Sequence, residues 1–168
     1  MTKKVLVIDT SILCCLLSIP GKETCGSGDD KWNKARVKDV LEREKNSVWV
    51  LPLASIIETG NHISQASHSR FDLATEFAGL LISAANATAP WTAFSEQSDL
   101  WSQASILALA ENWPALAVGG TSLGDATIKS VAEYYARGGI AVEILTGDAG
   151  LKSYEPAQPV LVPRRRAR

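Results

Sequence analysis

The sequence predicts an α/β fold with a short, mainly parallel central sheet, and three observations lead to this prediction. First, Val5–Ile8, Val48–Leu51 and Ile140–Leu145 are apolar runs rich in β-branched residues. Such runs are typical of strands that helices cover on both faces. Second, long stretches with helical spacing of apolar residues separate the three runs. Third, the alternation of strands with helical stretches is typical of parallel strands joined by helical crossovers.

The helices are expected where apolar residues recur three or four positions apart among polar ones. The expected helices span Ile12–Leu17, Trp32–Lys45, Leu53–Ile63, Phe71–Ala85, Ser98–Asn112 and Leu123–Arg137. Pro20–Asp30, with its Gly and Asp residues, is expected to be a flexible connection, and Trp91–Phe94 a brief edge strand. Because proline has no amide hydrogen to donate, we expect Pro114 to end the helix that precedes it.

The length and composition favour one folded domain with a charged end. The chain has 168 residues, 46% of them hydrophobic, so we predict a single domain over residues 1–163. Residues 164–168 form a basic C-terminal tail with four arginines. Residues 1–163 contain 13 Lys and Arg and 18 Asp and Glu, which gives a net charge of −5. A domain this acidic does not favour a broad nucleic-acid-binding surface, so a polyanionic substrate would need metal ions, a local basic patch or the tail.

Two further features bear on location. No apolar run approaches the roughly 20 residues that cross a bilayer, and the start lacks the pattern of a secretory signal. We therefore expect a cytoplasmic protein without membrane contact. The three cysteines, Cys14, Cys15 and Cys25, have no metal-ligand spacing. We expect them to be reduced core thiols, with a redox role as the alternative.

Four acidic residues stand at the ends of strands or near the starts of helices, and each has a local explanation. Asp9 can cap the first helix, and Asp148 can cap the short turn after the last strand. Glu58 lies three residues after Ser55, and Asp125 lies three residues after Ser122, which are the spacings of capping boxes. Taken singly, each acid is explained by helix capping.

Taken together, the four acids indicate more than capping. Asp9 and Asp148 directly follow strands of one parallel sheet, so they are expected at the same edge, where open α/β sheets bind ligands. Glu58 and Asp125 can reach over that edge from their helices. Converging carboxylates repel each other unless they are protonated or share a cation. Oxygen ligands with no His or Cys nearby suit Mg²⁺ or Mn²⁺.

Four segments in this order resemble a known family. The segments are Val5–Ser11, Leu51–Glu58, Leu123–Ala126 and Ile144–Asp148. Together they resemble the PIN-domain ribonucleases and are similar to the VapC-type toxins of bacterial toxin–antitoxin pairs. The resemblance implies a Rossmann-like, three-layer α/β/α sandwich and divalent-metal-dependent hydrolysis of RNA. It also implies RNA as the substrate, and a cognate antitoxin and a second copy of the chain as partners.

The resemblance also implies roles for individual residues. Asp9 and Asp125 would hold a first Mg²⁺, with Asp148 contributing directly or through a water, and Glu58 would hold a second ion or orient the attacking water. Thr146 matches a hydroxyl position that steadies Asp148 or a metal-bound water. We expect the Asp9 carboxylate to face the cleft while Thr10 or Ser11 caps the helix.

Two other classes of function compete with this one. A haloacid-dehalogenase-type phosphatase needs a second Asp two residues after the first, and Ser11 stands there. No glycine-rich nucleotide-binding loop follows the first strand. The alternative that stays open is a PIN-like module that binds RNA or a protein without cleaving it.

Overall fold

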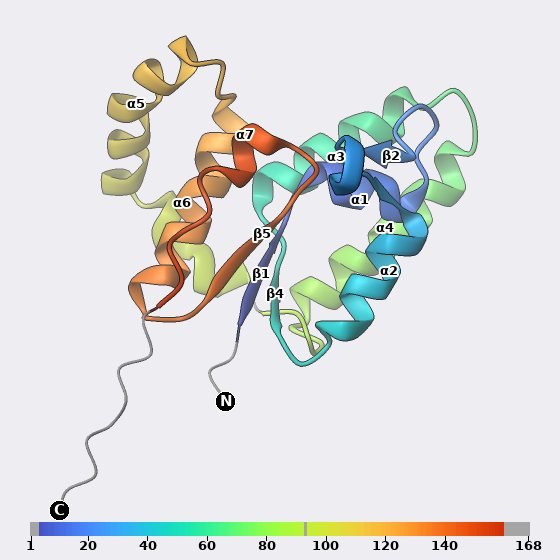
Figure 1. The fold of residues 1–168 in the computed structure, drawn as a ribbon, viewed down its shortest axis with the longest axis horizontal. Coiled ribbons are helices and arrows are strands. Elements are labelled where there is room, and N and C mark those ends of the chain that lie inside the picture. The colour runs from blue at the N-terminus through green and yellow to red at the C-terminus, as the bar shows by residue number, and fades with distance from the viewer. Residues whose placement is uncertain (1–3, 93, 160–168) are drawn as a thin grey trace, which may run out of the picture.

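The computed structural model describes residues 4–92 and 94–159, and a three-stranded parallel sheet lies at its centre (Figure 1). The strand order is β4-β1-β5, with β1 (Val5–Ile8) in the middle, β4 (Val48–Val50) on one side and β5 (Val142–Leu145) on the other. All three predicted apolar runs therefore form strands, and the predicted mixed α/β class with a short parallel sheet is confirmed.

Helices cover both faces of this sheet (Figure 1), an arrangement compatible with three α/β/α layers. One side carries α1 (Thr10–Leu17), α2 (Lys34–Arg43) and α4 (Arg70–Ala85), and the other carries α5 (Gln103–Val118), α6 (Leu123–Arg137) and α7 (Ala149–Lys152). Helix α3 (Leu53–Gln65) follows β4 and packs against both α1 and α6. It therefore spans from one helical layer to the other.

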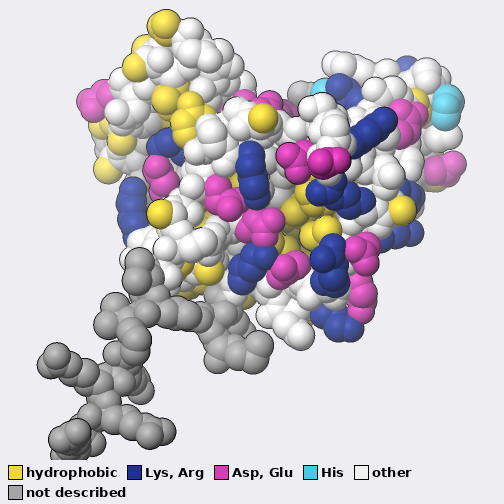
Figure 2. All heavy atoms as spheres, viewed as in Figure 1, with side chains coloured by type: hydrophobic (Ala, Val, Ile, Leu, Met, Phe, Trp, Pro, Cys, Tyr) yellow, Lys and Arg dark blue, Asp and Glu magenta, His cyan; other side chains and the backbone are white. Residues whose placement is uncertain are grey.

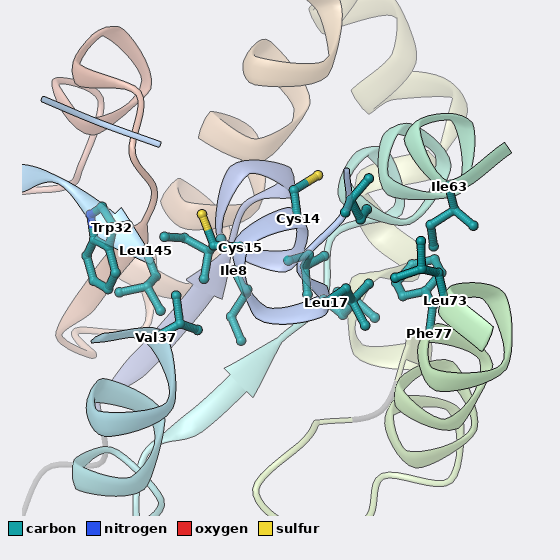
Figure 3. Packing of buried hydrophobic residues seen from close by; sticks show 14 of the residues in the cluster. Ile8, Cys14, Cys15, Leu17, Trp32, Val37, Ile63, Leu73, Phe77 and Leu145 are labelled. Atoms are coloured by element: carbon teal, nitrogen blue, oxygen red, sulfur yellow. The ribbon is translucent and has the colours of Figure 1, made fainter. Parts of the chain in front are cut away.

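Side chains of β1 alternate between the two layers, as the pleat of a strand requires. Val5 and Val7 pack with α6, whereas Ile8 packs with α1, α2 and α4. Figure 3 shows the cluster that contains Ile8, in which Ile8 lies between Val37 of α2 and Leu17 of α1. Fully burying an aliphatic side chain contributes about 1.5–3 kcal/mol, so these clusters fix the sheet and the positions of its strand ends.

The expected flexible connection at Pro20–Asp30 contains regular structure, which corrects that prediction. Strand β2 (Thr24–Cys25) pairs antiparallel with β3 (Trp32–Asn33), and the 3₁₀ helix η1 (Gly28–Asp30) joins them. Helix α2 accordingly begins later than expected, with the Asn33 side chain accepting a hydrogen bond from the Arg36 amide at 2.9 Å. Two-residue strands carry too little sequence pattern to be predicted.

The helix expected at Ser98–Asn112 is also corrected. Residues Phe94–Trp101 form the 3₁₀ helix η2, and α5 then runs from Gln103 to Val118 with Pro114 inside it. The helix continues past the proline, and two hydrogen bonds hold its C-terminal end. The Trp113 indole donates to the Thr121 carbonyl at 3.1 Å, and the Gly119 amide donates to the Leu116 carbonyl at 3.0 Å.

Of the predicted edge strand at Trp91–Phe94, the described residues form a single bridge. Trp91 pairs with Trp49 of β4, in parallel, and their rings meet edge to face with centroids 5.4 Å apart. No helix in the described ranges is long and apolar enough to cross a membrane. The basic tail, residues 164–168, lies outside the described residues. Figure 2 shows basic and acidic side chains interspersed on the face of the molecule that it presents.

Candidate active site

A cleft of about 310 Å³ lies where the carboxyl ends of β1 and β5 meet α3 and α6. All four predicted acids line it: Asp9 after β1, Glu58 on α3, Asp125 at the start of α6, and Asp148 before α7. These residues are up to 139 positions apart in the sequence. The fold therefore brings the four predicted acids together at one edge of the sheet.

Asp9 is the most firmly held of the four. Its side chain is 5% exposed, and its Oδ2 accepts hydrogen bonds from the Ser11 amide at 3.2 Å, the Ser11 hydroxyl at 2.7 Å and the Thr146 hydroxyl at 2.8 Å. Asp9 is itself the N-cap of α1. The expected division, with Asp9 in the cleft and a hydroxyl capping the helix, is therefore wrong. One oxygen of Asp9 carries all three of these bonds, so one carboxylate serves both the helix and the cleft.

Thr146 does not line the cleft but connects two residues that do. Its hydroxyl donates to Asp9 and accepts a hydrogen bond from the Asp148 amide at 3.0 Å. The Gly147 amide next to it donates to the Ser11 hydroxyl at 3.0 Å. Because these bonds tie the loop after β5 to the end of β1, Thr146 is a positioning residue for both acids.

Helix capping does not explain how the Glu58 side chain is positioned in the cleft. Helix α3 begins at Leu53, and the buried Ser55 hydroxyl has no hydrogen-bond partner among the described residues, so the predicted capping box with Ser55 is wrong. Instead, the Thr10 hydroxyl donates to Glu58 Oε2 at 3.1 Å. Its other oxygen lies against Gly124 of α6, where a Cβ atom would overlap it. A residue without a side chain at 124 thus leaves the space that the carboxylate occupies.

Asp125 and Asp148 combine cap-region positions with places in the cleft. The Ser122 hydroxyl accepts a hydrogen bond from the Asp125 amide at 3.0 Å, which confirms the predicted cap of α6. Asp148 Oδ1 accepts from the amides of Gly150 at 2.7 Å and Leu151 at 3.0 Å, which confirms its predicted cap. Asp125 and Asp148 therefore both lie in helix-cap regions and line the cleft.

The cleft disfavours the ionised forms of Glu58 and Asp125. Burial raises the pKa of Glu58, and the nearby charges of Asp125 and Asp9 raise it further, while the bond from Thr10 opposes the shift. Burial likewise raises the pKa of Asp125, and the charges of Asp9 and Asp148 add to it against the bond with Ser122. A bound cation would relieve this repulsion.

The donor set fits a hard divalent cation such as Mg²⁺ or Mn²⁺, since four carboxylates and the hydroxyls of Thr10, Ser11 and Thr24 line the cleft. Within residues 4–92 and 94–159, no group of three His, Cys, Asp or Glu side chains is drawn together tightly enough to hold an ion. The four carboxylates line one cleft without converging on a single point. Their role as ligands stays a prediction.

Sequence reasoning missed several residues that line the cleft. Cys14, Cys25 and His62 line it too, which corrects the expectation that no His or Cys lies near the acids. Burial raises the pKa of Cys14 to about 12, which favours the protonated thiol. Lys22 brings a positive charge to the cleft mouth from the turn after α1. The Pro20-Gly21 pair was the sequence signal for that turn, but nothing local showed that it folds back over the acids.

Comparisons with family models, with curated proteins and with solved structures found no significant match to this chain. The arrangement of the acids, Thr146 and Lys22 around the cleft is therefore the basis on which a function is assigned.

Proposed function

We propose that this protein is a divalent-metal-dependent endoribonuclease of the PIN-domain type, acting in the cytoplasm as the toxin of a toxin–antitoxin pair. The observation that carries the proposal is that Asp9, Glu58, Asp125 and Asp148 line one cleft at the carboxyl edge of a parallel sheet. Ligands bind at this edge in open α/β sheets. A phosphodiester is an anion, so it can approach four carboxylates only when cations offset their charge.

The ligands for Mg²⁺ or Mn²⁺ would be Asp9 and Asp125, with Asp148 contributing directly or through a water and Glu58 available to a second ion. When bound, the ion supplies an activated water at neutral pH and stabilises charge on the phosphoryl oxygens. Thr146 would keep Asp9 and Asp148 in position through its two hydrogen bonds.

Two residues of the chain would act on the substrate itself. Glu58, whose pKa is raised by burial, is suited to orient the attacking water and to accept its proton, with Thr10 fixing its orientation. Lys22 at the cleft mouth would pair with a phosphate of the RNA.

The shape of the surface supports a strand-like substrate. A second, polar hollow of about 260 Å³ shares Asp125 and Asp148 with the cleft and extends over Gly120 and Tyr154. A chain molecule can therefore pass across the acids and continue into the second hollow, with exposed backbone and hydroxyl groups along its path. A small ligand would not need this extension.

The replacement Asp9→Asn tests the proposed chemistry. The asparagine side chain keeps an oxygen for the bonds from Ser11 and Thr146, so we expect the circular dichroism spectrum to be unchanged. Cleavage of a labelled RNA in Mg²⁺ or Mn²⁺ should fall by at least about 100-fold, because a metal contributes several kcal/mol to the transition state.

The matched control is Asp39→Asn, which removes an exposed acid that pairs with Arg43 on the surface of α2. It should cleave as the wild type does. Undiminished cleavage by Asp9→Asn would overturn the proposal. A Mn²⁺ titration by calorimetry separates the alternative, a binding module without cleavage, because such a module should show no binding that depends on these carboxylates.

The toxin part of the proposal has support from an apolar groove beside the acids. This groove, about 550 Å³, is lined by Ile57, Trp101 and Leu123 among others, and it shares Glu58 with the cleft. Its lining includes large exposed side chains, with Ile57 56% exposed. A cognate antitoxin with an apolar segment and a basic side chain would suit both surfaces, and a second copy of the chain is the competing occupant.

Expression in bacteria tests the toxin role directly. Growth should stop when the wild-type chain is produced and continue when Asp9→Asn is produced at the same level. Light scattering of the purified chain then distinguishes a monomer from a dimer. Normal growth with active wild-type enzyme would remove the toxin role and leave the ribonuclease proposal standing.

A further inference from the structure

Two thiols from different elements meet beside the cleft. Cys15 lies on α1 and Cys25 on β2, and their sulfur atoms are 3.4 Å apart, with the Cys15 thiol donating to Cys25. Figure 3 shows the sulfur atoms of Cys14 and Cys15 on different sides of α1. The contact between Cys15 and Cys25 is therefore specific, although Cys14 is the immediate neighbour of Cys15.

The two thiols differ in their access to solvent. Cys15 is fully buried, whereas Cys25 is half-buried and lines the cleft. Burial raises the pKa of Cys15 to about 12, and its hydrogen bond to Cys25 adds to the shift. A small oxidant entering the cleft would thus meet Cys25 first, with Cys15 held as a thiol directly behind it.

Cys25 is also in contact with the loop that carries two of the site residues. A Cβ atom placed on Gly147 would overlap the Cys25 sulfur and would lie 2.9 Å from the Gly26 amide nitrogen. Gly147 stands between Thr146 and Asp148, and its amide donates to the Ser11 hydroxyl at 3.0 Å. The β2–β3 hairpin, which carries Cys25, is therefore in close contact with the loop 146–148. A shift of Cys25 must be accommodated by this loop.

We propose that Cys15 and Cys25 are a reversible disulfide site whose oxidation alters the loop 146–148. The oxidant is hydrogen peroxide. It oxidises the Cys25 sulfur to a sulfenic acid and leaves as water; the Cys15 sulfur then attacks the Cys25 sulfur, the S–O bond breaks, and the departing hydroxide takes the Cys15 proton. Two thiols and one peroxide thus give one disulfide and two waters. A dithiol reductant reverses the reaction by thiol–disulfide exchange.

The bond changes the packing around Cys25. The two sulfurs must approach by more than about 1 Å from their contact distance of 3.4 Å to form a covalent bond, so the side chains of Cys15 and Cys25 shift. Contact between Cys25 and Gly147 then changes, together with the support that Thr146 gives to Asp9 and Asp148. We expect oxidation to lower Mn²⁺ affinity and RNA cleavage by about tenfold, the effect of losing support around metal ligands. This second step depends on the function proposed above.

The first experiment tests the disulfide without reference to activity. The full chain is treated with hydrogen peroxide, its remaining thiols are blocked, and it is analysed by intact mass and peptide mapping. We expect a loss of two hydrogen atoms, a linkage between Cys15 and Cys25, and full recovery with dithiothreitol. Cys14→Ala should still form the bond, whereas Cys15→Ala and Cys25→Ala should not. A linkage through Cys14, a linkage between chains or no linkage would overturn the site.

The second experiment tests the effect on the loop. Hydrogen exchange of the peptide that contains residues 146–148 is compared between the reduced and oxidised wild type, and Mn²⁺ titration and RNA cleavage follow on the same samples. Changed exchange with tenfold weaker Mn²⁺ binding supports the coupling, and unchanged exchange overturns it. Because exchange and mass need no catalysis, a chain that never cleaves RNA would overturn the proposed function and leave the disulfide proposal to these two readouts.

Discussion

At the scale of single residues, the candidate site contains two carboxyl groups, Glu58 and Asp125, whose ionised forms the fold disfavours. Glu58 illustrates this because burial and the charges of Asp125 and Asp9 raise its pKa. In the unfolded chain, Glu58 ionises at its ordinary pKa of about 4.3. Between that pH and its higher folded pKa, the folded state holds a proton that the unfolded state has lost. Stability therefore falls as the pH rises through this window, and the loss is complete above the folded pKa.

The replacement Glu58→Gln should remove this loss of folding stability at higher pH. The glutamine side chain keeps an oxygen for the Thr10 hydroxyl and has a similar helix propensity. We expect the melting temperature of the metal-free protein to rise at pH 7 by about 2–4 °C, the change that about 1 kcal/mol makes in a domain of this size. The gain should shrink as the pH is lowered from 7 to 4, as followed by thermal scans at several pH values.

Glu76→Gln is the matched control, because Glu76 is an exposed acid on α4 away from the cleft. It should change the melting temperature by no more than about 1 °C at any pH. A gain for Glu58→Gln that is equal at pH 4 and pH 7 would attribute the effect to packing and not to charge.

Sequence reasoning located the acids for a clear physical reason. Asp9 and Asp148 follow buried strands, and the ends of parallel strands share an edge whatever the loops do. The orientation of Glu58 could not be predicted, because it depends on Thr10 and Gly124, which come from other elements. Lys22 and Cys25 were missed for the same reason, since a turn and a two-residue strand bring them to the cleft.

At the scale of elements, the close approach of α3 to α6 is the contact on which the position of Glu58 depends. Gly124 lies in the first turn of α6, and its missing side chain leaves room for one oxygen of Glu58. Its φ is not in the left-handed region, so alanine is compatible with the helix itself. The effect of a side chain at 124 should therefore fall on Glu58 and not on the backbone.

We expect Gly124→Ala to keep the fold and to lower Mn²⁺ affinity by about tenfold, because the new methyl group displaces the Glu58 carboxylate. Calorimetric titration with Mn²⁺ measures the affinity, and circular dichroism monitors the helices. Gly79→Ala is the matched control, since nothing lies within 4 Å of a Cβ placed on that glycine in α4. It should stabilise the protein by about 1 kcal/mol and leave Mn²⁺ binding unchanged. Equal affinities in the two variants would contradict this role for Gly124.

The elements differ in how well they could be predicted. Strands β1, β4 and β5 follow from their β-branched runs, and α6 follows from its apolar spacing and the Ser122 cap. Helix α5 departs from the prediction because it continues past Pro114 to Val118, and it packs against η2 and α6, contacts that no pattern within the helix reveals. Local patterns specify the elements that the core buries, and contacts between elements decide the others.

At the scale of the whole molecule, charge is distributed unevenly along the chain. Residues 1–163 have a net charge of −5, and the four arginines of residues 164–168 raise the total to −1. An acidic body repels RNA at long range, and metal ions in the cleft offset this only locally. The tail is therefore the strongest concentrated source of attraction for phosphates in the sequence.

Removing residues 164–168 should weaken RNA binding most at low salt. Each phosphate contact that is lost lowers the slope of log K against log salt by about 0.7 for a single strand. Fluorescence anisotropy from about 50 to 200 mM salt measures this slope in an Asp9→Asn background, where the proposed cleavage is disabled. Replacing the four arginines by lysines keeps the charge and should preserve most of the slope, whereas replacing them by glutamines should match the truncation. Equal slopes for the full-length and truncated chains would show that the tail does not contact the RNA, and would shift the attraction to Lys22 and the bound cations.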